Sequence, residues 1–192
     1  MARRKRGGIP MVIKKWYMPA ITIAAFTVIL FLWLILCAGK LNTFFILRTV
    51  MLITFSFMAM LIDLRKRCIP NRLVFGMFTG WLLLMVPKLL SDIQTGVPIL
   101  TDSVIGLLIG GGIFLSVYLL SRRGLGGGDV KFMAVAGLYL GFGGTLPAIL
   151  YGTVLAALSG LILIALKRIK RKDTIPLAPF LFAGIMITVF TT

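Results

Sequence analysis

Long apolar runs recur from one end of the chain to the other, and they limit the fold more than any other feature. With 59% hydrophobic residues, the chain carries more apolar surface than a soluble globular domain needs. A helix crosses the ~30 Å hydrocarbon layer of a membrane with about 20 apolar residues. We therefore predict an all-α polytopic membrane protein with about seven transmembrane helices. Their ranges are 18–38, 43–62, 73–90, 102–121, 130–143, 145–166 and 176–192.

The basic residues lie in short clusters between these runs and indicate the orientation of the chain. Of the 21 lysines and arginines, 18 fall in the tail before the first run or in the loops 63–72, 122–131 and 167–173. Cytoplasmic loops are rich in Lys and Arg, so we expect the N-terminus in the cytoplasm and the C-terminus outside. The net charge of +16 fits contact with anionic lipid at a cell inner (cytoplasmic) membrane better than binding to nucleic acid.

Two segments fit this topology less simply. The run 130–143 is short and rich in glycine, so it is a tilted helix, a helix that continues through Leu146, or a re-entrant loop. The last alternative would put the basic loop 167–173 outside, which the charge rule disfavours. Arg48 lies inside the run 43–62, near enough to the outer face for its side chain to snorkel to the headgroups. The stretches GMFTG, GLLIG and GLYLG have the spacing of small residues that lets helices approach closely.

The residue types that are missing exclude several kinds of catalytic site. The chain has no histidine, which excludes a Ser-His-Asp triad, a Cys-His pair and a histidine-based zinc site. Its two cysteines, Cys37 and Cys68, form no Cys-x-x-Cys pair, so neither a zinc site nor a disulfide framework is expected. All five acidic residues are aspartates, so aspartate chemistry without a metal or cofactor is what remains.

Three of the five aspartates have ordinary structural explanations. Asp102, next to Thr101, is predicted to cap the N-terminus of the fourth run, and Asp92 to lie in the outer loop before it. Asp173 is expected to balance the neighbouring lysines and to cap the last helix. Pro176 then falls in the first turn of that helix, where proline is common.

Asp63 and Asp129 are harder to explain in structural terms. A carboxylate at the C-terminal end of a helix, where Asp63 falls, is disfavoured by up to about 1 kcal/mol, unless the basic residues 65–67 offset this cost. Asp129 falls at the start of a helix, where its alternative role is an N-cap. A cap does not need the three glycines 126–128 before it. Such a run favours irregular backbone, a hinge or the close approach of another segment.

The charge-based topology places both of these aspartates at the cytoplasmic membrane boundary. One pair of antiparallel helices separates them, so the runs 43–62 and 130–143 can be neighbours. Two carboxyl groups a few ångströms apart cannot easily both ionise, and they share a proton. One can then activate a water molecule as general base while the other protonates a scissile amide. Such a pair would form an aspartic protease site inside a membrane.

Three stretches of the chain match a known set of motifs in the same order. They are DLRKRCIPNRL at residues 63–73, GLGGGDVKFMAVAGLYLG at 124–141 and IPLAPFLFAG at 175–184. Together they resemble the first-aspartate, second-aspartate and proline-phenylalanine motifs of the type IV prepilin peptidases (prepilin leader peptidases), membrane aspartic proteases with a GxGD motif. At Ala178 the family pattern has glycine. The resemblance covers about residues 43–192.

The resemblance implies a function for the aspartate pair. Members of this family are hydrolases that remove the basic leader peptide from type IV prepilins or pseudopilins at the cytoplasmic membrane face. Carried over by position, Asp63 and Asp129 are the catalytic residues. The expected partners are such prepilins and anionic membrane lipid. The basic loops would repel a basic leader, and the lipid headgroups are expected to screen this repulsion.

Five further residues belong to the matched motifs. Gly126 and Gly128 are expected to shape the backbone around the second aspartate. Pro70 and Asn71 are expected to begin the next apolar run. Lys131 is expected to hold a carboxyl group in its ionised form.

The chain also departs from longer members of this family. Those proteins N-methylate the new pilin terminus as well, and many carry a cytoplasmic domain with paired cysteines between their first two helices. Here Gly39 to Asn42 leave only a tight turn without Cys-x-x-Cys pairs, so we expect a peptidase without methyltransferase activity. The expected domains are a basic tail with an extra transmembrane helix, residues 1–42, and a six-helix peptidase domain, residues 43–192.

Two other functions are compatible with some of these features. The presenilin-like branch of the GxGD proteases has a Tyr-Asp pair and a Pro-Ala-Leu motif, whereas here Ile62 precedes Asp63 and the terminal stretch reads PLAPF. A small transporter or channel subunit would use boundary aspartates to handle cations or protons. Few ionisable residues other than Arg48 and Lys88 lie inside the apolar runs, which disfavours a polar transport pathway.

Overall fold

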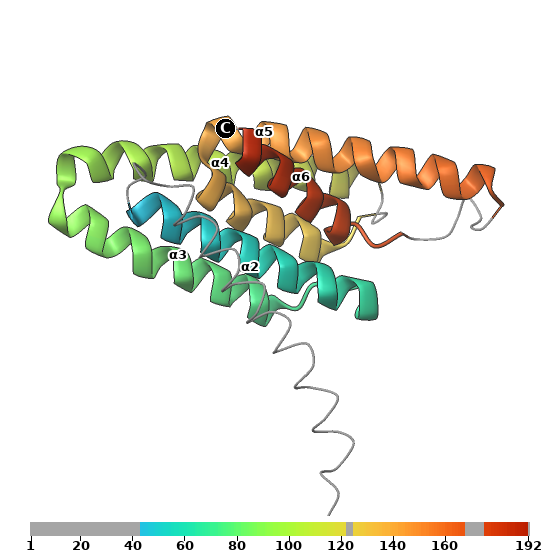
Figure 1. The fold of residues 1–192 in the computed structure, drawn as a ribbon, viewed down its shortest axis with the longest axis horizontal. Coiled ribbons are helices and arrows are strands. Elements are labelled where there is room, and N and C mark those ends of the chain that lie inside the picture. Colours follow the sequence, from blue (N-terminus) through green and yellow to red (C-terminus); the bar gives the residue numbers. More distant parts are fainter. Residues whose placement is uncertain (1–42, 122–124, 168–174, 192) are drawn as a thin grey trace, which may run out of the picture.

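The computed structural model describes residues 43–121, 125–167 and 175–191, and within them the chain folds as a bundle of α-helices. Figure 1 shows the helices packed side by side with their long axes roughly aligned. The predicted first apolar run, 18–38, and Asp173 lie outside the described residues. The helices are α2 (Thr43–Lys66), α3 (Asn71–Ser91), α4 (Ile93–Leu120), α5 (Gly127–Ala165) and α6 (Ala178–Thr191).

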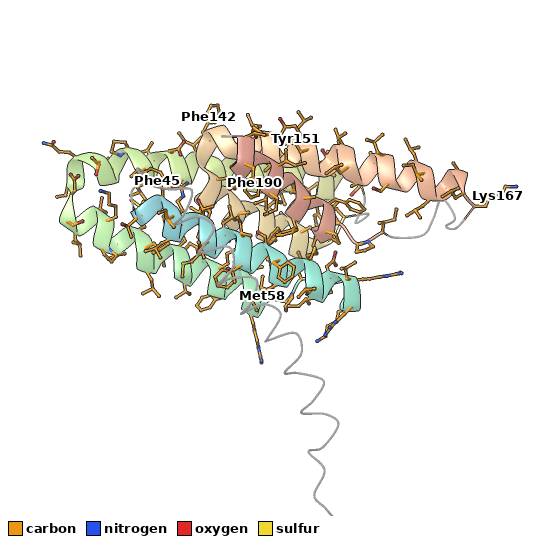
Figure 2. All side chains as sticks on the ribbon, in the orientation of Figure 1. Phe45, Met58, Phe142, Tyr151, Lys167 and Phe190 are labelled. Carbon is orange, nitrogen blue, oxygen red and sulfur yellow. The ribbon has the colours of Figure 1, made fainter. Side chains whose placement is uncertain are left out.

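The helices have the length and surface expected of a membrane protein. α2 to α5 are long and apolar enough to cross a membrane, and α6 is a shorter apolar helix. Large apolar side chains, including Phe142, Tyr151 and Phe190, lie exposed on the outside of the bundle (Figure 2). Lipid, not water, suits so extensive an apolar surface. The chain is therefore a multi-pass membrane protein, while the total of seven helices and the cytoplasmic position of the N-terminus stay predictions.

α5 is interrupted at Gly141, whose backbone has φ 68° and ψ −172°. This conformation is essentially restricted to glycine. In Figure 1 the chain turns back at this point, so that the arms 127–140 and 142–165 run in opposite directions. The two arms correspond to the predicted runs 130–143 and 145–166. Each arm therefore acts as a separate helix in the bundle.

Three side chains from other helices bind the backbone on either side of this break. The carbonyl oxygen of Leu138 accepts hydrogen bonds from Arg48 Nη2 at 3.2 Å and from Trp81 Nε1 at 3.1 Å. On the other side, Asp102 Oδ1 accepts a hydrogen bond of 2.9 Å from the amide of Phe142. The last carbonyl groups of a helix have no partner within it and favour a cation. Its first amide groups also have no partner and favour an anion. Arg48 and Asp102 thus complement the ends of the two arms.

These contacts correct two predictions. Arg48 does not snorkel, since its side chain is buried (7% exposed) and bonded to the backbone of α5. Asp102 is not an N-cap, because α4 already begins at Ile93 and contains it. α4 begins before the predicted apolar run 102–121, so Asp102 lies within the helix. There its side chain faces the break in α5.

Asp92 caps α4 in place of Asp102, which corrects its predicted position in a loop. Its Oδ1 accepts a hydrogen bond of 3.3 Å from the amide of Thr95, and its Oδ2 accepts one of 2.6 Å from the Thr95 hydroxyl. The Thr95 side chain lowers the pKa of the Asp92 carboxyl by this hydrogen bond. α3 and α4 are therefore connected by a single residue, Asp92, which caps α4.

α6 begins at Ala178, so Pro176 lies before the helix and not in its first turn as predicted.

The first arm of α5 forms the centre of the bundle. Phe132, Met133 and Leu138 on this arm are fully or almost fully buried. The arm packs closely on α4, because a side chain added at Gly106 or Gly137 would meet the backbone of the opposite helix. The prediction of close helix approach is therefore confirmed for GLLIG and GLYLG, whereas the glycines of GMFTG face side chains of neighbouring helices and not their backbone. The arm holds Asp129 at its start, so this packing fixes the position of that residue.

Candidate active site

The three matched motifs meet at one end of the bundle. α2 ends there, whereas α3, α5 and α6 all begin there (Figure 1). Asp63 lies in the last turns of α2, Asp129 in the first turn of α5, and Ala178 is the first residue of α6. Segments that are far apart in the sequence therefore contribute to one site.

Asp63 is buried and held by the start of α6. Its side chain is 5% exposed, and its Oδ2 accepts a hydrogen bond of 3.0 Å from the amide of Ala178. The N-terminus of a helix carries partial positive charge and unpaired amides, so it stabilises a carboxylate. This contact offsets the unfavourable position of Asp63 at the end of its own helix. The basic residues 65–67, which were the alternative, are exposed.

Asp129 is half-buried in the first turn of α5. Its amide donates a hydrogen bond of 3.1 Å to the carbonyl oxygen of Gly126, and Gly126 is the N-cap of the helix. Asp129 therefore does not take the N-cap position itself. The carboxyl group lies over Gly126, where an added Cβ would be 2.8 Å from Asp129 Oδ2. The Asp63 carboxyl group lies near enough for its charge to act on that of Asp129.

The glycine run provides space on two sides of Asp129. An added Cβ at Gly128 would lie 2.9 Å from the carbonyl oxygen of Ile69, in the connection between α2 and α3. An added Cβ at Gly127 would meet nothing within 4 Å. Gly128 thus permits close approach of another segment, which was one of the three predicted roles of the run. Gly126 leaves room for the Asp129 carboxyl group. Gly127 faces neither this carboxyl group nor another segment.

The remaining motif residues join α3 to α5. Pro70 is the N-cap of α3 and Asn71 its first residue, which confirms their predicted place at the start of this helix. Lys131 Nζ donates a hydrogen bond of 3.1 Å to Asn71 Oδ1. The ion pair found among the described residues joins Lys88 to Asp92, and none joins Lys131 to either aspartate. Lys131 therefore holds the Asn71 side chain instead of the expected carboxyl group.

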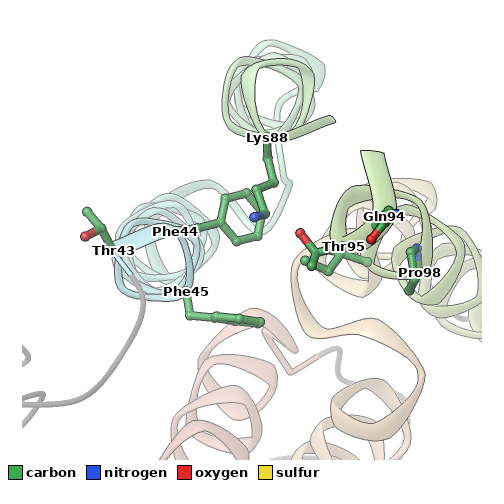
Figure 3. A pocket seen from close by; sticks show the side chains of 8 residues that line it. Thr43, Phe44, Phe45, Lys88, Gln94, Thr95 and Pro98 are labelled. Carbon is green, nitrogen blue, oxygen red and sulfur yellow. The ribbon is translucent and has the colours of Figure 1, made fainter. Parts of the chain in front are cut away.

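A cavity of about 610 Å³ lies at the opposite end of the bundle. Figure 3 shows Phe44, Lys88 and Thr95 around it. Thr43, at the start of α2, also lines the cavity, and the rise of the helix from there to Asp63 is roughly 30 Å. This cavity is therefore separate from the aspartate site. Among the described residues, no three potential metal ligands of the types His, Cys, Asp and Glu lie together.

Comparison with known proteins identifies the family of the chain. Residues 50–161 match the type IV leader peptidase family. The chain belongs to this family. The match includes the segments around Asp63 and Asp129 and ends before α6. The prediction of a type IV prepilin peptidase family is thus confirmed.

Several curated proteins named prepilin leader peptidase/N-methyltransferase resemble this member of the type IV leader peptidase family. The Escherichia coli (strain K12) protein is 33% identical over 131 residues, which are 66% of this chain and 55% of that protein. The Aeromonas hydrophila protein is 30% identical over 125 residues, 62% of this chain and 41% of the relative. The Bacillus subtilis (strain 168) protein is 28% identical over 123 residues, 64% of this chain and 46% of the relative. No solved structure matches the chain significantly.

The chain spans about half the length of the curated relatives it matches, from 41% to 55% in these three comparisons. Two features of the candidate site are not evident in the sequence. In the sequence, Ala178 is noted only because the family pattern has glycine at this position. In the structure its backbone amide binds Asp63, and this contact does not depend on the side chain at position 178. Asn71 is recognised as a motif residue, but its contact with Lys131 depends on the packing of α3 against α5.

Proposed function

We propose that this chain is a membrane-embedded aspartic endopeptidase that removes the basic leader peptide from type IV prepilins or pseudopilins. Asp63 and Asp129 are its catalytic pair. The observation that carries the proposal is that the three motifs meet at one end of the bundle, where Asp63 lies near enough to Asp129 for its charge to act on that carboxyl group. The names of the relatives support the substrate class.

The two carboxyl groups share one proton, because a neighbouring charge opposes ionisation of both. The ionised carboxylate takes a proton from a water molecule as the water oxygen bonds to the scissile carbonyl carbon. The protonated carboxyl donates its proton to the carbonyl oxygen, which gives a tetrahedral diol. The carbon–nitrogen bond then breaks. The leaving nitrogen receives the proton taken from water, one hydroxyl of the diol returns its proton to the other carboxylate, and the pair regains its starting state.

The site acts at the cytoplasmic face of a cell inner membrane. The exposed residues Arg65 and Lys66 in the last turn of α2, and Arg67 just after it, lie beside Asp63, and the positive-inside rule assigns such basic clusters to the cytoplasm. Anionic headgroups near these residues also attract the basic leader of a substrate. The activity we propose is that of a peptidase without N-methylation, carried by the six-helix unit of residues 43–192.

Cleavage of a type IV prepilin by membranes that contain the protein tests this function. The unmodified protein is expected to cleave the prepilin at its leader junction. Asp63→Asn and Asp129→Asn each keep the size of the side chain and remove its ability to exchange a proton. Each is expected to lower the cleavage rate by at least ~100-fold, the usual contribution of general acid–base catalysis.

Asp92→Asn is the matched control, because Asp92 is a helix cap at the opposite end of the bundle and asparagine caps helices equally well. This variant should cleave at the unmodified rate, with all variants inserted at equal levels. The proposal would be contradicted by unchanged cleavage in either catalytic variant, or by no cleavage of several prepilins by the unmodified protein. Ion flux through proteoliposomes would then be measured to test the transporter alternative.

A further inference from the structure

The cavity of about 610 Å³ at the end of the bundle remote from the aspartates lies just beyond the break in α5. Phe44 of α2 and Pro98 of α4 line this cavity. Arg48 and Asp102, four residues later in the same two helices, contact the backbone on either side of the break. Residues four apart lie on one face of a helix, about one turn from each other. The first arm of α5 therefore stops about one turn before the cavity and leaves the centre of the bundle unfilled there.

The cavity lies between α2, α3 and α4. Among the described residues α3 packs against both other helices, whereas α2 and α4 do not contact each other. The side chains of Phe44, Lys88 and Thr95, one from each helix, extend into the space between them (Figure 3). The lining has an apolar part, Phe44, Phe45, Pro98 and Ile99, and a polar part, Thr43, Lys88, Gln94 and Thr95. A ligand that contacts both parts has to be amphiphilic.

Two opposite charges lie beside the polar part of the cavity. Lys88 Nζ is 3.8 Å from Asp92 Oδ2, and this oxygen also accepts the hydrogen bond from the Thr95 hydroxyl. Charge-assisted hydrogen bonds are about 2.7–2.9 Å long, so the ammonium and the carboxylate do not form one with each other. Both groups therefore keep the capacity to bind a ligand group of opposite charge.

The cavity lies at the depth of lipid headgroups. The rise of α2 from Thr43 to Asp63 is roughly 30 Å, about the thickness of the hydrocarbon layer. The two ends of the bundle therefore lie at the two boundaries of the membrane. At the aspartate end, the exposed residues Arg65, Lys66 and Arg67 are all basic, which favours anionic lipid. At the cavity end one lysine faces one aspartate, and this balance favours a headgroup that carries both charges.

We infer that this cavity binds a zwitterionic aminophospholipid, with the phosphate of its headgroup at Lys88 and the ammonium at Asp92. The first part of an acyl chain lies against the apolar wall. The bound lipid joins α2 to α4 where the first arm of α5 does not reach. Because the site lies roughly 30 Å from the aspartates, the lipid takes no part in cleavage. The inference goes beyond the proposed function and does not depend on it.

Three other occupants match the cavity less well. Inorganic phosphate would pair with Lys88 but would leave Asp92 and the apolar wall without a partner. An anionic lipid would place a negative charge near Asp92 without a cation to balance it. The chain before Thr43 has basic residues and no acidic one, so it offers a partner for Asp92 and none for Lys88. The aminophospholipid complements both charges and the apolar wall.

Native mass spectrometry of the full chain, purified in detergent and titrated with lipid, tests the inference. The probes are phosphatidylethanolamine, phosphatidylcholine and phosphatidylglycerol with the same acyl chains, and inorganic phosphate. The quaternary ammonium of phosphatidylcholine has no hydrogen to donate to Asp92. One phosphatidylethanolamine per chain should therefore bind about 10-fold or more tightly than phosphatidylcholine, the scale of one charge-assisted hydrogen bond. Phosphatidylglycerol or inorganic phosphate at equal concentration should not displace it.

Two substitutions remove the charges one at a time. Lys88→Gln and Asp92→Asn should each lower the affinity for phosphatidylethanolamine by about 10-fold or more. Asp92→Asn should also abolish the preference over phosphatidylcholine. Lys66→Gln removes an exposed lysine at the aspartate end and is the matched control. It should weaken retention of phosphatidylglycerol and leave that of phosphatidylethanolamine unchanged.

Filling the cavity should have the same effect as loss of a charge. Ile99→Trp places a large ring in the lining, and Ile99→Phe is a smaller substitute if the tryptophan variant does not fold. Both should lower the affinity for phosphatidylethanolamine. Val97→Trp adds the ring at an exposed position of α4 that does not line the cavity, so it should bind the lipid normally.

The inference is overturned if phosphatidylethanolamine and phosphatidylcholine bind equally, or if phosphatidylglycerol or inorganic phosphate displaces the bound lipid. It is also overturned if Lys88→Gln and Asp92→Asn bind like the unmodified protein. Retention of no lipid would overturn it too, and would be the result expected if the chain before Thr43 filled the cavity. Each of these outcomes leaves the test of the proposed function by prepilin cleavage unaffected.

Discussion

The carboxyl group of Asp63 and the backbone amide of Ala178 are joined by a hydrogen bond of 3.0 Å, although the two residues are 115 positions apart. The contact fixes a buried catalytic candidate from outside its own helix. Because the donor belongs to the backbone, a change of side chain at position 178 leaves it in place. The alanine that departs from the family pattern is therefore compatible with an active site.

Removal of this donor alone should impair catalysis. Ala178→Pro deletes the amide hydrogen at the first position of α6, where proline is well tolerated because this amide has no partner within the helix. A hydrogen bond to a charged group contributes about 1.5–3 kcal/mol. We expect prepilin cleavage to fall by about 10-fold or more, measured as the initial rate in detergent or in membranes.

Two substitutions at the same position control for size and conformation. Ala178→Gly and Ala178→Ser both keep the amide hydrogen, and serine also adds an atom at this buried position. Both should retain activity close to that of the unmodified protein. If the serine variant lost as much activity as the proline variant, crowding and not the hydrogen bond would be responsible.

The glycine run should show different tolerance at neighbouring positions. Gly128→Ala places a methyl group 2.9 Å from the carbonyl oxygen of Ile69, so the start of α5 has to move. Displacement of a catalytic group by about 1 Å can lower the rate ~100-fold. We therefore expect Gly128→Ala to reduce kcat by about 10- to 100-fold. Gly127→Ala meets nothing within 4 Å and should cleave normally. Equal rates for both variants would argue against a positional role of Gly128.

The break in α5 should depend on Gly141. An alanine there has to adopt a backbone conformation that costs of order 1–3 kcal/mol, and its methyl group would meet the Asp102 carboxyl. With a total of about 2 kcal/mol, the unfolding temperature in detergent should fall by roughly 4–8 °C. Gly143→Ala is the control, because an added Cβ there meets nothing within 4 Å. A fall of the same size for Gly143→Ala would show that the loss is not specific to the break.

Cys68 provides a native probe of orientation. It is exposed in the connection between α2 and α3, next to the basic residues that predict a cytoplasmic location. In a Cys37→Ser background, a membrane-impermeant maleimide should label Cys68 in inside-out vesicles and leave it unlabelled in intact cells. Ser91→Cys, at the opposite end of α3 and in a Cys68→Ser background, should show the reverse pattern. Labelling of Cys68 in intact cells would refute a cytoplasmic active site.

Sequence patterns predict much of the bundle because apolar length and proline position are local signals. The run 73–90 follows Pro70, and α3 begins one residue after this proline. The start of α4 is not evident, because its first turns contain Gln94, Thr95 and Pro98, which are common in loops. Their backbone is nevertheless helical, so the hydrogen-bonded start lies nine residues before the apolar run at 102.

The site can be predicted from the sequence only in part. Charge clusters predict that Asp63 and Asp129 share one membrane face, and this gives reason to pair them. The amide that holds Asp63 depends on how α6 packs against α2, which no local pattern encodes. The same is true of Asp102, whose distance of 40 residues from Phe142 conceals their contact. A polar residue within an apolar run is therefore best explained after its tertiary partner is known.

The hydrogen bond between Arg48 and Leu138 joins two segments that are made at different times during synthesis. Arg48 leaves the ribosome 90 residues before Leu138, the residue whose carbonyl it binds. At about 5–20 residues per second, α2 waits roughly 5–18 s for this acceptor. During this time the guanidinium lacks the carbonyl oxygen that it binds in the folded bundle. Its burial is thus a late step, and the end of the bundle remote from the aspartates closes only after the first arm of α5 has been delivered to the membrane.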